Sequence, residues 1–509
     1  MRNIRRSVQP CFAALAAALA LAVPASASAS TPPGGVEGVK VPTLHWKDCR
    51  HGFQCATAAV PRDYARPAGP TFRLAVIRRP ARERAHRIGS LFLNPGGPGG
   101  SGVEFLRNVA PALAALNKRF DLVSWDPRGV GASRPAVRCY TDAEVRRMVR
   151  EQLAAPSVSP GKLDEGAAIA AARSQAAHCL KSTRGVLPYL STGNVARDLD
   201  VLRAAVGDER LSYLGYSYGT AIGMTYVSMF PDRQRAIALD GAVDTTWFDD
   251  PLRFDHGQAI AKEAELGRFL EACRAHRRGC GFGGAHPRRA LDALLARLDR
   301  TPIADRDLPV NGEIARAFIG ELLNVPALWP LLARGLRRAQ HGDGSVMKAI
   351  MATDLGENDA SYTAVRANDA AWPTSPSAYR QEAQRASIDF PHFAGVYGFA
   401  ELSFAYLRPQ TNGRFDGPFR TPDDAPTTLV VGTTFDPATP YADAKALVTT
   451  LGNARLLTLD GDGHGASYIN GNGTCIDDAV TAYLVDQQLP GVGKVCDQAP
   501  QTFAGTARG

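Results

Sequence analysis

The chain has 509 residues, of which 45% are hydrophobic and 21% are charged, and its formal net charge is +8. This length and composition are typical of a globular protein with one large core and room for an inserted unit. The basic residues are interspersed with acidic ones, so the modest positive charge gives no support for nucleic-acid binding.

The first 29 residues predict a signal peptide. A basic start at Arg2, Arg5 and Arg6 precedes an apolar run over 11–23, and small residues up to Ala29 suit a signal peptidase. The run is too short and too rich in small residues for a membrane anchor, and no other segment approaches eighteen unbroken apolar residues. We therefore expect an exported protein, secreted or located in the periplasm or cell envelope, with no stable membrane insertion and a charge of +5 after cleavage.

A glycine-rich loop follows an apolar strand in the segment LFLNPGGPGGSG at residues 91–102. A phosphate-binding loop of the Walker type would end in Gly-Lys-Ser/Thr, which is absent here. Backbone N–H groups of such a loop can form half of an oxyanion hole, where one donor stabilises the transition state by roughly 3 kcal/mol. Gly96 or Gly97 would supply that N–H, with Gly97 assigned to the role, and Tyr218 would supply the second one.

The motif GYSYG at residues 215–219 predicts a nucleophile elbow around Ser217. A β-like run over 210–214 precedes the motif, and an apolar, helix-compatible segment over 220–226 follows it. A sharp strand-to-helix turn holds the serine hydroxyl clear of the backbone, where a histidine can deprotonate it. The flanking glycines have a steric reason, because a side chain there would collide with the strand or the helix.

An acid and a histidine follow two late predicted strands. The strand pattern over 427–435 ends at Asp436, and a second pattern over 454–459 leads into a glycine-rich loop that carries His464. The order serine, acid, histidine is that of an α/β-hydrolase. Asp436 would orient His464, which would deprotonate Ser217 and then protonate the leaving group. Asp240, at the end of an earlier apolar run, competes for the role of the acid, but we favour Asp436.

The predicted core strands fall into two blocks separated by a long insertion. Residues 30–245 form the first block of the core, 246–421 the insertion, and 422–509 the second block. Segments 259–274 and 290–298 have the apolar spacing of amphipathic helices. The fold class predicted is therefore α/β: a mostly parallel, doubly wound sheet with a large helical cap over the site.

Nine cysteines occur, and one of them, Cys11, lies in the predicted signal peptide. An exported chain would pair the other eight in an oxidising compartment. Pairing of sequence neighbours suggests Cys49–Cys55, Cys139–Cys179, Cys273–Cys280 and Cys475–Cys496, although eight cysteines allow 105 connectivities. No C-x-x-C or H-E-x-x-H motif favours a metal site, and we expect neither a metal nor another cofactor.

Six strings in order resemble those of the secreted tripeptidyl aminopeptidases of actinomycetes, relatives of prolyl aminopeptidases. They are NPGGPGGSG at 94–102, WDPRGVGAS at 125–133, GYSYGT at 215–220, LDG at 239–241, DPATP at 436–440 and GHG at 463–465. The resemblance extends over most of the chain. It implies an α/β-hydrolase with a helical cap that cleaves short peptides from a free amino terminus.

An exopeptidase must hold the substrate's ammonium group at a fixed distance from its nucleophile, which requires carboxylates from the cap. The candidates are Asp369, Glu263 and Glu265. The family often has Cys-x-Asp in the cap, whereas this chain reads Ala367-Asn368-Asp369 and has lost the cysteine. In the string at 125–133 we interpret Asp126 and Arg128 as structural residues.

The first functional hypothesis is a secreted serine exopeptidase that releases tripeptidyl units from small peptide substrates. The alternative is a carboxylesterase or lipid-ester hydrolase with the same triad, because acyl transfer to serine serves esters and amides alike. A catalytically silent binding protein on this scaffold would have lost a triad member, yet all three are present. Epoxide hydrolases and dehalogenases are disfavoured because they use an aspartate at the elbow.

Overall fold

The computed structural model describes residues 36–154, 164–183, 185–305, 309–354, 360–394, 399–470 and 473–499, together with Phe503. The predicted signal peptide, residues 1–29, lies outside the described residues. The core and the insertion belong to one unit that begins at Pro33.

A single sheet of ten strands organises the described residues, in the order β1-β2-β3-β5-β4-β6-β7-β8-β9-β10. Pairs β1/β2, β2/β3 and β3/β5 are antiparallel, and every pair from β5/β4 to β9/β10 is parallel. Strands β4, β5 and β6 are buried at every residue, as expected for parallel strands covered on both faces. The bounds are Lys47–Asp48, Gln54–Pro61, Thr71–Arg79, Gly89–Asn94, Phe120–Trp125, Leu211–Tyr216, Gln234–Asp240, Thr428–Phe435, Ala454–Asp462 and Val495–Asp497 for β1 to β10.

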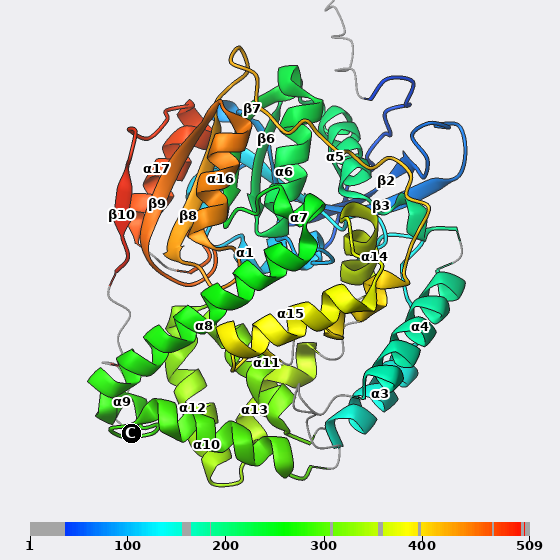
Figure 1. Ribbon diagram of the computed structural model, residues 1–509. Coiled ribbons are helices and arrows are strands. Elements are labelled where there is room, and N and C mark those ends of the chain that lie inside the picture. Colours follow the sequence, from blue (N-terminus) through cyan, green and yellow to red (C-terminus); the bar gives the residue numbers. More distant parts are fainter. Residues whose placement is uncertain are drawn as a thin grey trace, which may run out of the picture. The chain divides into compact units, whose positions relative to one another are not determined.

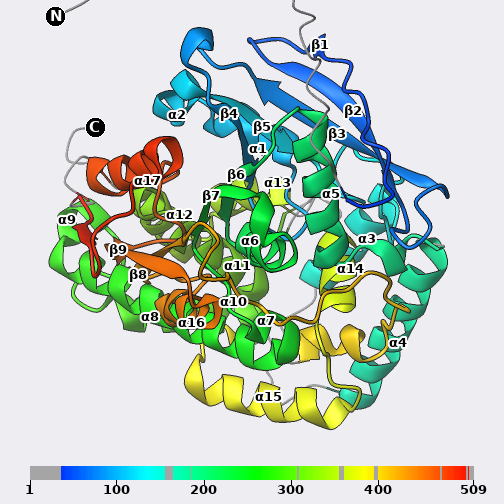
Figure 2. The ribbon, with the colours of Figure 1, turned by 90° about the horizontal axis from the view of Figure 1, so that it is seen from above.

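Helices cover both faces of this sheet (Figures 1 and 2). One hydrophobic cluster joins the sheet to α5 (Thr192–Ala205), α6 (Tyr218–Met229) and α16 (Tyr441–Leu451). Another joins it to α1 (Gly102–Val109), α2 (Ala114–Arg119) and α17 (Thr474–Asp486). The predicted doubly wound, mostly parallel fold is confirmed.

The insertion is a helical cap with its own hydrophobic core, which lies on one side of the sheet domain in Figure 1. The segments predicted as amphipathic helices fall inside α8 and α10. The cap helices are α7 (Thr246–Asp249), α8 (Pro251–Ala275), α9 (Arg277–Cys280), α10 (Pro287–Arg300), α11 (Gly312–Leu323), α12 (Trp329–Gln340), α13 (Ser345–Asp354), α14 (Ala360–Asp369) and α15 (Pro376–Asp389).

Two helices from the first block, α3 (Asp142–Ala154) and α4 (Glu165–Ser182), extend the cap (Figure 1). Ala172 of α4 packs in a cluster with Tyr379 and Trp372 of the cap, and Glu165 forms an ion pair with Arg380. The boundary predicted at residue 245 therefore leaves part of the cap-side structure in the core block. The sequence pattern identifies amphipathic helices but does not say which neighbour covers their apolar side.

Four disulfides join the cysteine pairs that sequence neighbourhood suggested. They span 6, 40, 7 and 21 residues along the chain. Such bonds persist in oxidising compartments and fit an exported protein. Across the described ranges, no helix combines the length and the apolar character needed to cross a membrane.

A fully buried ion pair fixes the loop after β5. Arg128 donates two hydrogen bonds to Asp198 of α5, at 2.7 and 2.5 Å, and the hydroxyl of Tyr64 donates to the same carboxylate at 2.7 Å. Asp126 of the same loop accepts from the Ser101 hydroxyl at 2.7 Å and so ties the loop to the start of α1. Both residues of the WDPRG string therefore serve structural roles.

Replacing Asp198 by asparagine is expected to lower the free energy of unfolding by about 3 to 5 kcal/mol, because Arg128 would keep a buried charge without its counter-ion. Urea denaturation of the two proteins measures the difference. The matched control is Asp142→Asn, which removes the exposed pair with Arg138 and should leave the denaturation midpoint unchanged. Equal midpoints for all three proteins would contradict the prediction.

Candidate active site

The ends of five strands meet at the carboxyl edge of the parallel strands. The glycine-rich loop follows β4, Ser217 follows β6, Asp240 ends β7, Asp436 follows β8, and the His464 loop follows β9. Because parallel strands point the same way, these residues gather at one edge of the sheet, where open α/β sheets bind their ligands.

Ser217 lies in a strained turn between β6 and α6. Its backbone has φ 54° and ψ −128°, a conformation that side chains rarely adopt. A Cβ on Gly215 would lie 2.5 Å from the carbonyl oxygen of Gly219, and a Cβ on Gly219 would lie 2.8 Å from that of Asn94. The two glycines are therefore sterically required, as the motif predicted. The Ser217 N–H donates to the Asp240 carbonyl at 2.9 Å.

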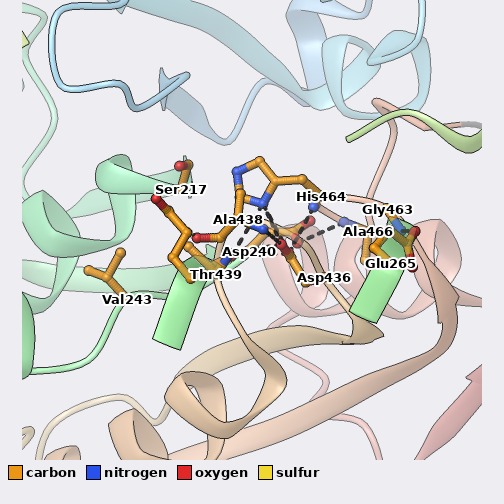
Figure 3. A network of polar contacts seen from close by, with 12 residues as sticks. Ser217, Asp240, Val243, Glu265, Asp436, Ala438, Thr439, Gly463, His464 and Ala466 are labelled. Atoms are coloured by element: carbon orange, nitrogen blue, oxygen red, sulfur yellow. Dashed lines mark hydrogen bonds and ion pairs between the residues drawn. The ribbon is translucent and has the colours of Figure 1, made fainter. Parts of the chain in front are cut away.

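His464 and Asp436 form a hydrogen-bonded pair. The Nδ1 atom of His464 lies 2.9 and 3.0 Å from the two carboxylate oxygens of Asp436. Figure 3 shows the imidazole between Asp436 and Ser217, with its other edge on the serine side. Gly241 connects the two residues. A Cβ on Gly241 would lie 3.1 Å from Cε1 of His464, and the carbonyl of the preceding residue, Asp240, accepts the Ser217 N–H. The three residues expected from the sequence are therefore brought together.

Asp240 makes a different set of contacts. Its carboxylate accepts backbone N–H groups of Ala466 at 2.9 Å and of Ser467 at 2.7 Å, and it accepts the Ser467 hydroxyl. Burial raises the pKa of Asp240 to about 6, although these hydrogen bonds oppose the shift. Asp240 thus supports the loop that follows His464, and Asp436 is the acid that contacts the imidazole.

The pKa of His464 is raised above its ordinary value of 6.5. Burial alone would lower it, but the charge and hydrogen bond of Asp436, together with the charge of Asp240, outweigh burial. An imidazole in this setting accepts a proton readily, which is the property that a general base needs.

The contacts of the glycine-rich loop distinguish its two candidate donors. The N–H of Gly96 is occupied, because it donates to Oδ1 of Asn94 at 2.9 Å. A Cβ on Gly96 would lie 2.8 Å from the Cβ of Ser217, so the loop passes directly beside the elbow. Within the described part of the chain, the N–H groups of Gly97 and Tyr218 have no hydrogen-bond partner. These are the two donors assigned from the sequence.

Asp369 is buried at the boundary between the cap and the core. Its carboxylate accepts the N–H of Thr192 at 2.8 Å and the hydroxyl of the same residue, so it caps α5 from α14. The Thr192 hydroxyl also lies 2.6 Å from the hydroxyl of Tyr218. Burial raises the pKa of Asp369 to about 6. A cap acid is therefore linked, through one threonine, to the residue after the serine.

The two glutamates of α8 lie in different surroundings. Glu263 is paired with the imidazole of His392 and also accepts the backbone N–H of His392, at 3.3 Å. Glu265 is fully buried and accepts the N–H of Gly463, beside His464, at 3.2 Å. Both Glu263 and Asp369 are occupied by partners inside the protein. An amine pocket built from Asp369, Glu263 and Glu265 therefore stays a prediction, and of the two glutamates only Glu265 contacts the histidine loop.

One polar side chain of the site was missed by the sequence analysis. The hydroxyl of Thr439 donates to Asp436 at 3.0 Å and lies 3.2 Å from Nδ1 of His464. Its position three residues after the acid, in a turn whose N–H groups bind that acid, is the signal that could have found it. No group of three or more His, Cys, Asp or Glu side chains in the described ranges is arranged to hold a metal ion.

Comparison with known proteins agrees with this geometry. Residues 89–283 match the family model described as alpha/beta hydrolase fold, and residues 410–496 match the one described as TAP-like protein. Serine protease Hip1 of Mycobacterium tuberculosis is 35% identical, over 89% of this chain and 91% of that protein. Carboxylesterase B of the same organism is 34% identical over 95% and 96%, and tripeptidyl aminopeptidase of Streptomyces lividans is 31% identical over 87% and 84%.

Proposed function

This chain belongs to the family of α/β-hydrolases that includes the tripeptidyl aminopeptidases, and it is a serine hydrolase. From that premise we propose that it is an exported exopeptidase, which removes tripeptidyl units from the free amino terminus of short peptides. The observation that carries the proposal is the position of the serine, histidine and acid directly beneath the cap. Gln258 of α8 donates to the Ala438 carbonyl in the turn of the acid, and Glu265 contacts the histidine loop. A cap in contact with both the acid turn and the histidine loop would admit chain ends more readily than folded proteins.

The chemistry assigned to the residues is acyl transfer. Ser217 attacks the carbonyl carbon of the scissile bond while His464 removes the hydroxyl proton, and Asp436 stabilises the imidazolium that forms. His464 then gives the proton to the leaving amine, which departs with the C-terminal part of the peptide. Water, deprotonated by the same imidazole, hydrolyses the acyl-enzyme and restores the Ser217 hydroxyl.

The negative charge of the tetrahedral intermediate is assigned to the oxyanion hole of Gly97 and Tyr218. Their N–H groups have no partner inside the described chain, so they can both donate to the developing oxyanion. Asp369 and Thr192 would hold the Tyr218 side chain, and hence its backbone, in a fixed position.

The acid limb of the kcat/KM profile is expected to lie above pH 6.5, because activity requires neutral His464 and the pKa of this residue is raised. Asp240→Asn removes one of the charges that raise it, so the limb should move to lower pH. Hydrolysis of an uncharged short-chain ester between pH 5 and 8 measures the acid limb of the wild type and that of the variant. A limb below pH 6.5 in the wild type, or no movement in the variant, would contradict the assignment.

The experiment that tests the function compares three substrates: a fluorogenic tripeptide amide, its N-acetylated form and a short-chain ester. The mature enzyme and Ser217→Ala are assayed in parallel. We expect the free-amine peptide to be strongly preferred, with no turnover by the variant. Equal rates on the two peptides would show that no group recognises the ammonium, and would reject the exopeptidase.

The second candidate is a carboxylesterase with the same residues. The relative named carboxylesterase B matches 95% of this chain, which is the observation in its favour. In the same assay, turnover of the ester alone would establish the esterase.

A further inference from the structure

The cap holds the backbone on either side of the proposed catalytic base. The His464 N–H donates at 2.8 Å to the carbonyl of Asn324, the residue that directly follows α11. The preceding N–H, that of Gly463, donates to Oε1 of Glu265 on α8 at 3.2 Å (Figure 3). Gly463 has φ +94°, and a Cβ there would lie 2.5 Å from Pro326 of the cap. Two successive amides of the histidine loop are therefore bound by the cap and not by the sheet.

Glu265 has no part in the acyl-transfer steps described above, although it is fully buried beside them. Its second oxygen, Oε2, has no hydrogen-bond partner in the described part of the chain. The nearest cation is Arg268, with Nε at 3.7 Å from Oε2, and that guanidinium is also paired with Asp462. A buried carboxyl with one oxygen hydrogen-bonded and the other without a hydrogen bond needs a specific explanation.

The protonation state of Glu265 explains how this carboxyl can be buried without a close counter-ion. Burial is the main cause that raises its pKa, to about 9, and the charges of Asp462 and Asp436 act in the same direction. Arg268 and the hydrogen bond from Gly463 oppose the shift only in part. At pH 7 the carboxyl is neutral, so it accepts the Gly463 N–H without burying an uncompensated charge.

We propose that Glu265 is a positioning residue for His464, which it fixes by holding the backbone amide of Gly463 from the cap. The inference rests on the proposed function, because it takes His464 to be the base. It makes the cap part of the catalytic arrangement and not only a cover, since a displacement of α8 would displace the imidazole. Ionisation of Glu265 would place a second negative charge beside Asp462 and disturb this arrangement.

Two substitutions separate positioning from charge. Glu265→Gln keeps an uncharged carbonyl oxygen that accepts the Gly463 N–H, whereas Glu265→Ala removes the acceptor. The readout is the rate at which an uncharged fluorophosphonate labels Ser217, which needs no amino group on the probe and so does not report on an amine pocket. We expect Glu265→Gln to label within about twofold of wild type at pH 7.5. Glu265→Ala should label at least about tenfold more slowly, since small displacements of catalytic groups have effects of this size.

The pH profile supplies a readout that a purely structural role would not change. The wild-type labelling rate should fall as pH rises through about 9, where Glu265 ionises. Glu265→Gln has no ionisable group at this position, so its rate should stay level through the same range. Glu271→Ala is the matched control, because Glu271 is exposed on the same helix and paired with Arg274, also exposed; it should behave as wild type.

The outcomes are distinct. Slow labelling of Glu265→Ala, rescue by Glu265→Gln and loss of the alkaline fall in that variant support the inference. Labelling of Glu265→Ala at the wild-type rate overturns it, as does a Gln variant that is equally slow or keeps the alkaline fall. If Glu265→Ala does not fold, the comparison of wild type with Glu265→Gln still decides. Failure of wild type to be labelled at all would instead reject the proposed function.

Discussion

Replacement of Ser217 by alanine is expected to lower kcat by about 10⁴-fold or more and to abolish labelling by a fluorophosphonate, because the hydroxyl that forms the acyl-enzyme is removed. Alanine at this position would adopt the same strained backbone, φ 54°, and it takes up no more space than serine. The fold should therefore be retained, with an unchanged circular dichroism spectrum. Intact-protein mass spectrometry after exposure to the probe measures the loss of labelling directly.

The control for this experiment is Ser228→Ala. Ser228 lies in the last turn of the same helix, where its hydroxyl donates to the Met224 carbonyl and accepts the Arg420 N–H, away from the strand ends that form the site. Its variant should be labelled at the wild-type rate. Appreciable labelling of Ser217→Ala would assign the nucleophile to another residue and would refute the mechanism.

The second large effect is expected from Asp436→Asn, which should lower kcat by about 10⁴-fold, by analogy with the acid of the serine-protease triad. Asparagine fills the same space, but its amide cannot stabilise the imidazolium and favours the wrong tautomer of His464. The wild-type carboxylate also accepts the N–H groups of Ala438 and Thr439 at 2.8 Å, which the remaining carbonyl oxygen can still accept. The loss should therefore appear in kcat and not in stability.

Asp240→Asn is the matched variant, because the same change is made to the other acid that was considered from the sequence. Its carboxylate contacts the backbone of Ala466 and Ser467 and not the imidazole. We expect kcat of this variant to fall far less than that of Asp436→Asn, because the imidazole keeps the acid that contacts it. A larger loss in Asp240→Asn than in Asp436→Asn would reverse the assignment of the acid. Steady-state kinetics on the tripeptide amide and the ester would give both values.

Local patterns predicted much of this site because the chemistry is encoded in short segments. The glycines at 215 and 219 are needed by the turn itself, so their spacing identifies Ser217 without any long-range information. The order of the serine, the acid and the histidine along the chain identifies the fold class in the same way. The disulfide pairs could also be predicted from local sequence, because three of the four bonds join cysteines that are at most 21 residues apart.

Other features depended on contacts between distant segments. The choice of Asp436 over Asp240 depends on which carboxylate faces Nδ1 of His464, and the choice of Gly97 over Gly96 depends on the side chain of Asn94. The attachment of α4 to the cap, which the boundary at residue 245 missed, depends on which apolar surfaces meet.

The reaction class follows from the sequence alone, because a serine elbow, a glycine-rich loop and a late histidine are properties of short segments whose backbone geometry is local. The contacts of the cap carboxylates, by contrast, depend on tertiary packing. Asp369, Glu263 and Glu265 have the same chemical group, and the sequence offered all three as ligands for an amine. In the structure, Asp369 caps α5, Glu263 pairs with His392, and Glu265 holds the histidine loop. Burial and the direction of a hydrogen bond arise from packing between segments up to 198 residues apart, and no local pattern specifies them.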